Sequence, residues 1–143
     1  MQRRAFIDTN VPMYAAGKVH PYKDACIQIL HRVAIGELLA CTDAEVHQEI
    51  FHRYWSIGLL DKALQVSADF LEVVPDVLPV TVAEIKKTAE LAQEYPLLTP
   101  RDWLHLAVML NNGITEIISA DRHFDDIEGI TRLDPREFVQ EQP

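Results

Sequence analysis

The sequence predicts an α/β fold in which a central parallel sheet carries helices on both faces. Short apolar runs alternate along the 143 residues with longer segments whose apolar side chains recur at helical spacing. Glycines and prolines mark the junctions between these segments. Strands that alternate with helices form crossover units, whose strands run parallel within one sheet. The length and the 48% hydrophobic content predict one domain over residues 1–143.

The first third of the chain is expected to supply two strands and two helices. Residues 5–7 form a short apolar strand, and the Asn-Val-Pro stretch at 10–12 breaks it and begins a short helix. Apolar residues at helical spacing predict a helix over 22–35, which Gly36 ends. The apolar run 38–41 is the second strand.

The middle of the chain is expected to be mostly helical. The stretch 42–45, Thr-Asp-Ala-Glu, resembles a capping box that opens a helix ending at Gly58. A further amphipathic helix covers about 61–73, and residues 77–80 form a strand that Pro79 restricts to an edge or a terminus. The apolar stripe of the first of these helices consists of Val46, Ile50, Tyr54 and Ile57.

The last third begins with two capped helices. A second capping box, at 81–84, opens a helix to about residue 94. Thr99 followed by Pro100 starts the second of these helices, which runs to Asn111. This helix is apolar nearly all round, as expected of a buried helix. The remaining elements are expected to be strands at 116–120 and 130–133 and a turn of helix at 135–139.

Composition limits the class of protein. The formal net charge is −9, which argues against a passive nucleic-acid coat but not against an enzyme that binds nucleic acid locally. Cys26 and Cys41 fit buried thiols in a reducing compartment rather than a disulfide framework. Asp8 interrupts the apolar stretch after the basic start, so we expect no signal peptide. No apolar run reaches membrane-spanning length, and a cytoplasmic location is expected.

Two aspartates follow predicted strands directly. Asp8 comes after the strand at 5–7, and Asp121 after the strand at 116–120. Either residue alone is explained equally well by a turn or a helix cap. Ligands of open parallel sheets, however, bind beyond the carboxyl ends of the strands, where both residues would lie. Two acids at such ends therefore indicate a ligand site.

Two helical acids are candidates for the same site. Asp102 occupies a capping position, but its helix is apolar, and an acid there needs a partner. Glu49 lies beside the apolar stripe of its own helix, with Glu45 as the rival candidate; we assign Glu45 to the cap and Glu49 to the site. Clustered carboxylates repel one another without a cation. Mg²⁺ and Mn²⁺ prefer oxygen ligands, so a divalent metal site is the hypothesis that explains the cluster.

The ordered motifs resemble those of PIN-domain ribonucleases over essentially the whole chain. They are Phe-Ile-Asp-Thr-Asn at 6–10, Glu-Ile at 49–50, Asp-Trp-Leu-His-Leu-Ala at 102–107 and Ile-Ser-Ala-Asp-Arg-His-Phe at 118–124. The resemblance implies a three-layer α/β/α sandwich with a central parallel sheet. It also implies hydrolysis of RNA phosphodiester bonds with Mg²⁺ or Mn²⁺. Relatives often carry Thr and Asn before the last aspartate, where this chain has Ser119 and Ala120.

The resemblance also assigns roles. By position, Asp8, Glu49, Asp102 and Asp121 take the catalytic and metal-binding places, with Asp125 as an optional ligand. Thr9 and Ser119 match supporting hydroxyl positions. The compact length is similar to that of VapC-type toxins, which implies a VapB-like antitoxin partner and a homodimer. The alternative is a non-catalytic PIN-like module that binds RNA or protein.

Other interpretations are weaker. A haloacid-dehalogenase-like phosphatase needs a second aspartate where Asn10 stands, and a receiver domain needs an acidic pair and a late lysine that are not evident. Arg101 and Arg122 adjoin site acids and are equally consistent with phosphate contacts or simple counterions. Two further groups are expected to be structural rather than functional. They are the histidines His47, His52, His105 and His123, as surface or core residues, and the tryptophans Trp55 and Trp103, as core residues.

Overall fold

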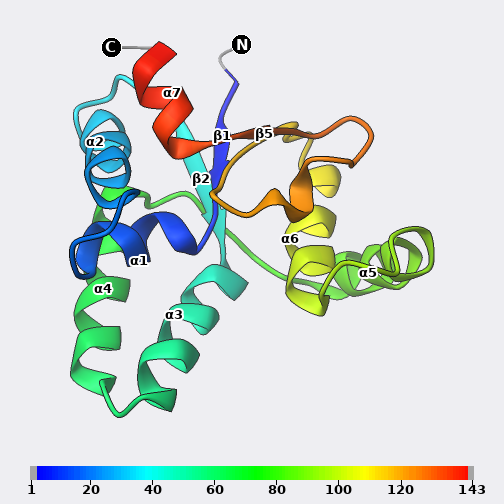
Figure 1. Cartoon of the computed structure of the whole chain (residues 1–143). Helices are drawn as coiled ribbons and strands as arrows, with labels where there is room; N and C mark the ends of the chain where they lie inside the picture. The colour runs from blue at the N-terminus through cyan, green and yellow to red at the C-terminus, as the bar shows by residue number, and fades with distance from the viewer. Residues whose placement is uncertain (1–2, 142–143) are drawn as a thin grey trace.

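The computed structural model describes residues 3–141 and confirms the α/β class (Figure 1). Its sheet has five parallel strands in the order β3-β2-β1-β4-β5. The strands are β1 (Ala5–Ile7), β2 (Ala40–Asp43), β3 (Val77–Leu78), β4 (Glu116–Ile118) and β5 (Thr131–Leu133). The helices are α1 (Asn10–Ala16), α2 (Lys23–Ala34), α3 (Ala44–Ser56), α4 (Leu60–Val73), α5 (Val82–Glu94), α6 (Pro100–Asn111) and α7 (Pro135–Glu141), with a 3-10 turn η1 (Arg122–Phe124).

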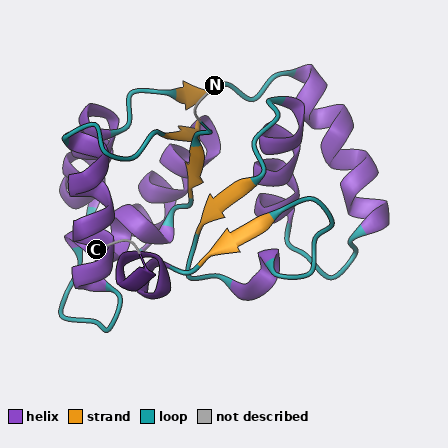
Figure 2. Ribbon diagram, turned by 90° about the horizontal axis from the view of Figure 1, so that it is seen from above, coloured by secondary structure: helices purple, strands orange, loops and turns teal. Residues whose placement is uncertain are grey.

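Helices cover both faces of the sheet, as expected of a three-layer arrangement. In Figure 1, α1, α2 and α4 lie on one side of the strands and α5 and α6 on the other, and Figure 2 shows the strands between these two groups. The α5–α6 and α3–α4 pairs pack as hairpins, and α7 packs on α2. Within residues 3–141, no helix combines the length and apolar character needed to span a membrane.

The strand order places a switch point between β1 and β4. From β1 the chain moves outward to β2 and β3, and it then crosses back to add β4 and β5 on the other side of β1. Ile7 and Ile118 are register partners across this junction, and the Asp8 amide donates to the Ile118 carbonyl at 3.1 Å. Such reversals open a crevice at the carboxyl ends of the two strands. The residues that follow β1 and β4 therefore face each other.

The helix caps explain where the site-bearing helices begin. Thr99 caps α6 in a capping box with Asp102, and Pro100 occupies the first turn, as predicted. Thr81 and Glu84 form the predicted box at the start of α5. The expected box at 42–45 is wrong by one residue. Thr42 belongs to β2, where its amide pairs with the Asp76 carbonyl, and Asp43 caps α3 instead.

Two core assignments are wrong. Trp55 is 62% exposed and Ile57 is 67% exposed, because both residues lie at the end of α3, where the chain turns into α4 beyond the sheet. Ile57 continues the helical spacing of Val46, Ile50 and Tyr54, but no layer covers the end of the helix. Trp103 is half-buried and donates from Nε1 to the Tyr95 carbonyl. Cys26 and Cys41 are free, buried thiols, as expected, and burial raises the pKa of each to about 12.

Candidate active site

A polar pocket of about 160 Å³ opens near the carboxyl ends of β1 and β4. The four acids singled out from the sequence, Asp8, Glu49, Asp102 and Asp121, all line it. The first and last follow strands, whereas Glu49 comes from α3 and Asp102 from the first turn of α6. The other lining residues are Thr9, Asn10, Arg53, Thr99, Arg101, His105 and His123.

Asp8 is held by three hydrogen bonds. Its Oδ1 accepts from the Thr9 backbone amide at 2.8 Å. Its Oδ2 accepts from the Ser119 hydroxyl at 2.6 Å and from Nδ2 of the Asn10 side chain at 3.2 Å. Ser119 Oγ in turn accepts from Asn10 Nδ2 and from the Asp121 amide, both at 3.0 Å. The Ser119 hydroxyl therefore ties the end of β1 to the end of β4.

Burial raises the pKa of Asp8, and this outweighs the lowering by His105 and by the hydrogen bonds from Ser119 and Thr9. Desolvation disfavours the charged form of a buried carboxylate. A carboxyl group buried at the end of a strand, with a raised pKa, is a frequent mark of a functional site. The fold accordingly keeps Asp8 in a place where a cation would stabilise it.

Glu49, rather than Glu45, reaches the pocket. Its Oε1 accepts from the Thr9 hydroxyl at 3.0 Å. Its Oε2 lies 3.3 Å from Arg101 Nη1 and 3.6 Å from Arg53 Nη1. Burial opposes ionisation, but His105, Arg101 and Thr9 outweigh it and hold the pKa of Glu49 below its usual value. Glu45 is half-buried and is not among the residues that line the cavity.

His105 lies behind the acids on α6. Its Nδ1 is 2.7 Å from Asp43 Oδ2, and both side chains are buried. Its Nε2 has no hydrogen-bond partner among the described residues and lies 3.9 Å from Asp8 Oδ1 and 4.0 Å from Glu49 Oε1. Burial alone would lower the pKa of His105, but the surrounding carboxylates, with Asp43 foremost, outweigh it and raise the pKa well above its usual value.

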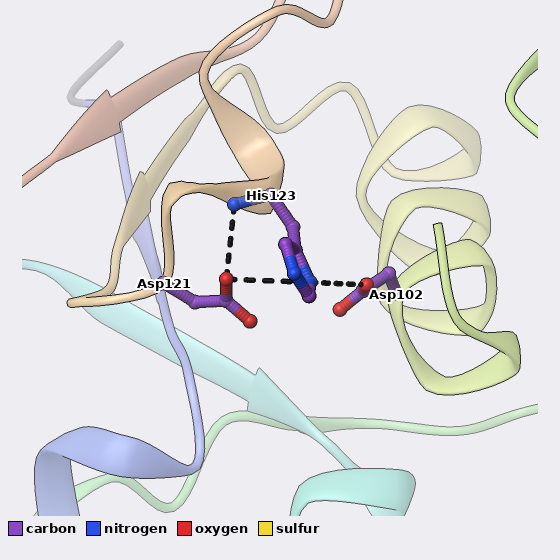
Figure 3. Close-up of side chains that lie close together, drawn as sticks. All are labelled: Asp102, Asp121 and His123. Atoms are coloured by element: carbon purple, nitrogen blue, oxygen red, sulfur yellow. Dashed lines mark hydrogen bonds and ion pairs between the residues drawn. The ribbon is translucent and has the colours of Figure 1, made fainter. Parts of the chain in front are cut away.

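The other two acids share a histidine (Figure 3). His123 Nδ1 lies 3.0 Å from Asp102 Oδ2 and 3.3 Å from Asp121 Oδ1. Asp102 Oδ2 also accepts from the Thr99 amide, and Asp121 Oδ1 accepts from the His123 amide. Asp102 is thus both the cap that its sequence position suggests and a lining residue of the pocket.

The structure places Asp125 outside the pocket. Its carboxylate pairs with Arg132, whose Nε lies 2.5 Å from Oδ1, and Asp125 is not among the lining residues. The expectation of an optional fifth ligand has no support from this geometry, because the Arg132 pair holds the carboxylate at the β5 side of the sheet. Arg122 is exposed and likewise does not line the pocket.

The donor set fits a hard divalent cation. One ligand atom each of Asp102, Asp121 and His123 lie within 4.8 Å of one another. Carboxylate oxygens, the ligands that Mg²⁺ and Mn²⁺ prefer, also reach the pocket from Asp8 and Glu49. Burial disfavours the charged form of Asp8, and a cation in the pocket would offset this cost.

Sequence reasoning missed several members of the site. His105 and His123 were expected to be surface or core residues without a role in the site, yet both line the pocket and lie near its carboxylates. Arg53, which pairs with Glu49, was not predicted as a site residue. The available signals were positional. His105 lies three residues after Asp102 on the same helix, and His123 two after Asp121. Arg53 lies one turn after Glu49, the spacing of a helical ion pair. His47, in contrast, binds Ser67 away from the pocket.

Comparison with known proteins places these features in a family. The profile of the PIN domain matches residues 5–130, which include all four acids. The chain belongs to the PIN domain family. Ribonuclease VapC13 of Mycobacterium tuberculosis is 40% identical over 128 residues, covering 89% of this chain and 97% of the relative. Ribonuclease VapC23 of the same species is 33% identical over 119 residues, covering 81% and 91%.

A solved structure agrees with the fold of this PIN domain. A chain from the crystal structure of VapBC2 from Rickettsia felis, bound to a DNA fragment from its promoter, superposes with a TM-score of 0.72. The match covers 90% of this chain and 96% of that chain at 16% identity. At that identity the similarity concerns the fold alone, and it confirms the three-layer α/β/α sandwich predicted from the sequence.

Proposed function

We propose that this chain is a single-domain, metal-dependent endoribonuclease, with Asp8, Glu49, Asp102 and Asp121 as its catalytic and metal-binding residues. The observation that carries the proposal is their convergence on one pocket at the switch point of a PIN domain. The names of the 40% and 33% identical relatives, both ribonucleases, support RNA as the substrate. RNA as the substrate also fits the cytoplasmic location expected from the sequence.

Mg²⁺ or Mn²⁺ would supply charge stabilisation at the phosphate and a source of hydroxide at neutral pH. The side chains of this chain hold and orient the acids. Ser119 and Asn10 fix Asp8, and Thr9 fixes Glu49. Arg53 and Arg101, which pair with Glu49, are positioned to attract the RNA phosphate. We expect direct hydrolysis, with a 5′-phosphate and a 3′-hydroxyl as product ends.

A cleavage assay on generic single-stranded RNA tests the enzymatic proposal. We expect cleavage with Mg²⁺ or Mn²⁺, none in excess chelator, and a loss of more than about 100-fold in Asp8→Asn and Asp121→Asn, because even changes around metal ligands cost 10- to 100-fold. Asp69→Asn, an exposed change on α4, is the matched control and should cleave like the parent.

Full activity in chelator or 2′,3′-cyclic phosphate ends would contradict the mechanism. Binding of RNA without cleavage would favour the non-catalytic alternative.

We further propose that the enzyme is the toxin of a VapBC-type pair, with a VapB-like antitoxin and a homodimeric state. The VapBC2 structure from Rickettsia felis, whose matching chain shares the fold of this protein, supports this partner. Four large apolar side chains are exposed around the end of α3 and the start of α4, which is a common mark of a protein interface. They are Trp55, Ile57, Leu59 and Leu60.

Growth arrest on expression, relieved by a small adjoining gene, would support the assignment, and a strictly monomeric, non-toxic protein would contradict it.

A further inference from the structure

A second hollow adjoins the carboxylate pocket. Its volume is about 380 Å³, within the range of sites that hold small organic ligands. The connection between α5 and α6 forms one wall, and η1 with the turn after it forms the other. The same two segments wall the carboxylate pocket through Thr99 and Asp121, and His123 lines both hollows. We call the second hollow the Leu97 groove.

Apolar side chains line both walls of the Leu97 groove. Leu97 is 96% exposed on the α5–α6 connection, Tyr95 and Leu98 are partly buried beside it, and Ile127 is buried in the opposite segment. Pro96 and Pro100 flank Leu97 and restrict the backbone of the connection. An apolar side chain held in this exposed position has little to contact within the chain itself.

Charged groups at the groove suit a nucleotide. Arg122 is exposed and takes part in none of the ion pairs formed within residues 3–141, so its guanidinium is free for a phosphate. Glu94 and Asp126 also line the groove, and their carboxylates can accept from the amino groups of a base. An apolar wall, one cation and two acceptors together match a heteroaromatic base on a phosphate backbone.

We propose that the Leu97 groove binds the nucleobase next to the scissile phosphate of single-stranded RNA and favours bases with an exocyclic amino group over uracil. The inference rests on the proposed ribonuclease function. RNA is favoured over a protein segment as the occupant because His123 lines both the groove and the carboxylate pocket, and because Arg122 lines the groove without an ion-pair partner within residues 3–141.

Binding without cleavage is the first test. The Kd of a short, mixed-sequence oligoribonucleotide is measured in chelator for the parent, Leu97→Ser, Arg122→Gln and the control Val19→Ser, whose side chain is 98% exposed on the α1–α2 connection. We expect Leu97→Ser to weaken binding about tenfold and Val19→Ser to leave it unchanged. Arg122→Gln should weaken binding of all sequences alike. It should also reduce the slope of log Kd against log salt concentration by about one, the value for one lost phosphate contact.

Base preference is the second test. A pool of RNAs with a randomised segment is cleaved by the parent, by Glu94→Gln and by Asp126→Asn. The frequency of each base next to the cleavage site is then compared among the three proteins. We expect uracil to be disfavoured at this position by the parent and tolerated by at least one variant. Unchanged Kd in Leu97→Ser together with an unchanged profile would overturn the inference while leaving cleavage, and the proposed function, intact.

Two further outcomes are decisive. A parent that neither binds nor cuts RNA would remove the proposed function and the groove's role together. If Leu97→Ser keeps its affinity for RNA but loses that for the antitoxin, the groove belongs to a protein partner and the inference is wrong.

Discussion

The imidazole of His105 joins Asp43 at 2.7 Å and directs its other nitrogen towards Asp8 and Glu49, at 3.9 and 4.0 Å. Asp43 also caps α3 by accepting from the Val46 amide. One buried pair therefore links the start of the helix that carries Glu49 to the helix that carries Asp102. It places a proton-holding group behind two carboxylates that would otherwise repel each other.

The first prediction concerns this pair. Asp43→Asn keeps a good capping residue but removes the charge that raises the pKa of His105. We expect the His105 ring to titrate at lower pH in the variant than in the parent, and the free energy of unfolding to fall by about 1.5–3 kcal/mol near neutral pH, as for a lost charged hydrogen bond. NMR titration of the ring nitrogens and urea unfolding measure the two quantities.

The sign of the pH dependence follows from the raised pKa. A folded-state pKa above the unfolded value of about 6.5 stabilises the fold fully below pH 6.5, and this contribution is lost as pH rises through the folded-state pKa. The parent should therefore lose stability above pH 6.5, and Asp43→Asn should show a shallower loss in that range. Identical ring titration curves in the two proteins would show that Asp43 does not hold the proton on His105.

The second prediction concerns Asp8 without metal. Burial raises its pKa, so the contribution of Asp8 to the free energy of unfolding is fully present below pH 3.8 and is lost as pH rises through the folded-state pKa. Asp8→Asn, which stays neutral, should match or exceed the parent in stability at neutral pH, by up to about 1 kcal/mol. Below pH 3.8 the advantage should vanish. Urea unfolding in chelator across this pH range measures the difference.

A uniformly less stable Asp8→Asn protein would contradict that expectation. It would mean that the hydrogen bonds from Ser119 and the Thr9 amide outweigh the cost of burying the charge. The metal response separates the two cases further. Mn²⁺ should raise the melting temperature of the parent more than that of Asp8→Asn, because a ligand stabilises the state that binds it.

The third prediction separates Asp125 from Asp121. Asp125 pairs with Arg132 on a partly exposed surface, so Asp125→Asn should cost only about 0.2–1 kcal/mol. Arg132 keeps its hydrogen bond to the Ser119 carbonyl. The rise in melting temperature with Mn²⁺ should be unchanged in Asp125→Asn and reduced in Asp121→Asn, which lines the pocket. Loss of the metal response in Asp125→Asn would restore Asp125 as a ligand.

The fold was predictable because its signals are local. Thr99 and Pro100 indicate the start of α6. The short apolar runs before Asp8 and Asp121 predict the two strands that flank the switch point. Strand ends of a parallel sheet share one edge, so the convergence of these two aspartates also follows from the sequence. Ile57 shows the limit: its spacing continues the apolar stripe of α3, yet it is 67% exposed, because helical spacing does not reveal where the covering layer ends.

The rest of the site depends on contacts between distant segments. Asp43 and His105 are 62 residues apart, and neither residue type indicates the other. A histidine on an apolar helix is more often a core residue, and only the packing of α6 beside β1 and α3 reveals its place behind the acids. His123 is similar, since its ring meets Asp102 across the pocket from another element.

The last prediction asks what His123 does between Asp102 and Asp121. Its ring is 52% exposed and occupies the place where a cation would contact both carboxylates. Because Mg²⁺ prefers oxygen ligands, we expect the imidazole to be a counterion that a metal displaces rather than a ligand. His123→Asn should then bind Mg²⁺ and Mn²⁺ as tightly as the parent or more tightly, by calorimetry on the protein without RNA. If the ring is a ligand, both affinities fall, and that for Mn²⁺ falls further because imidazole suits transition metals better. Asp102→Asn is the companion variant, and it should lose affinity for both metals in either case.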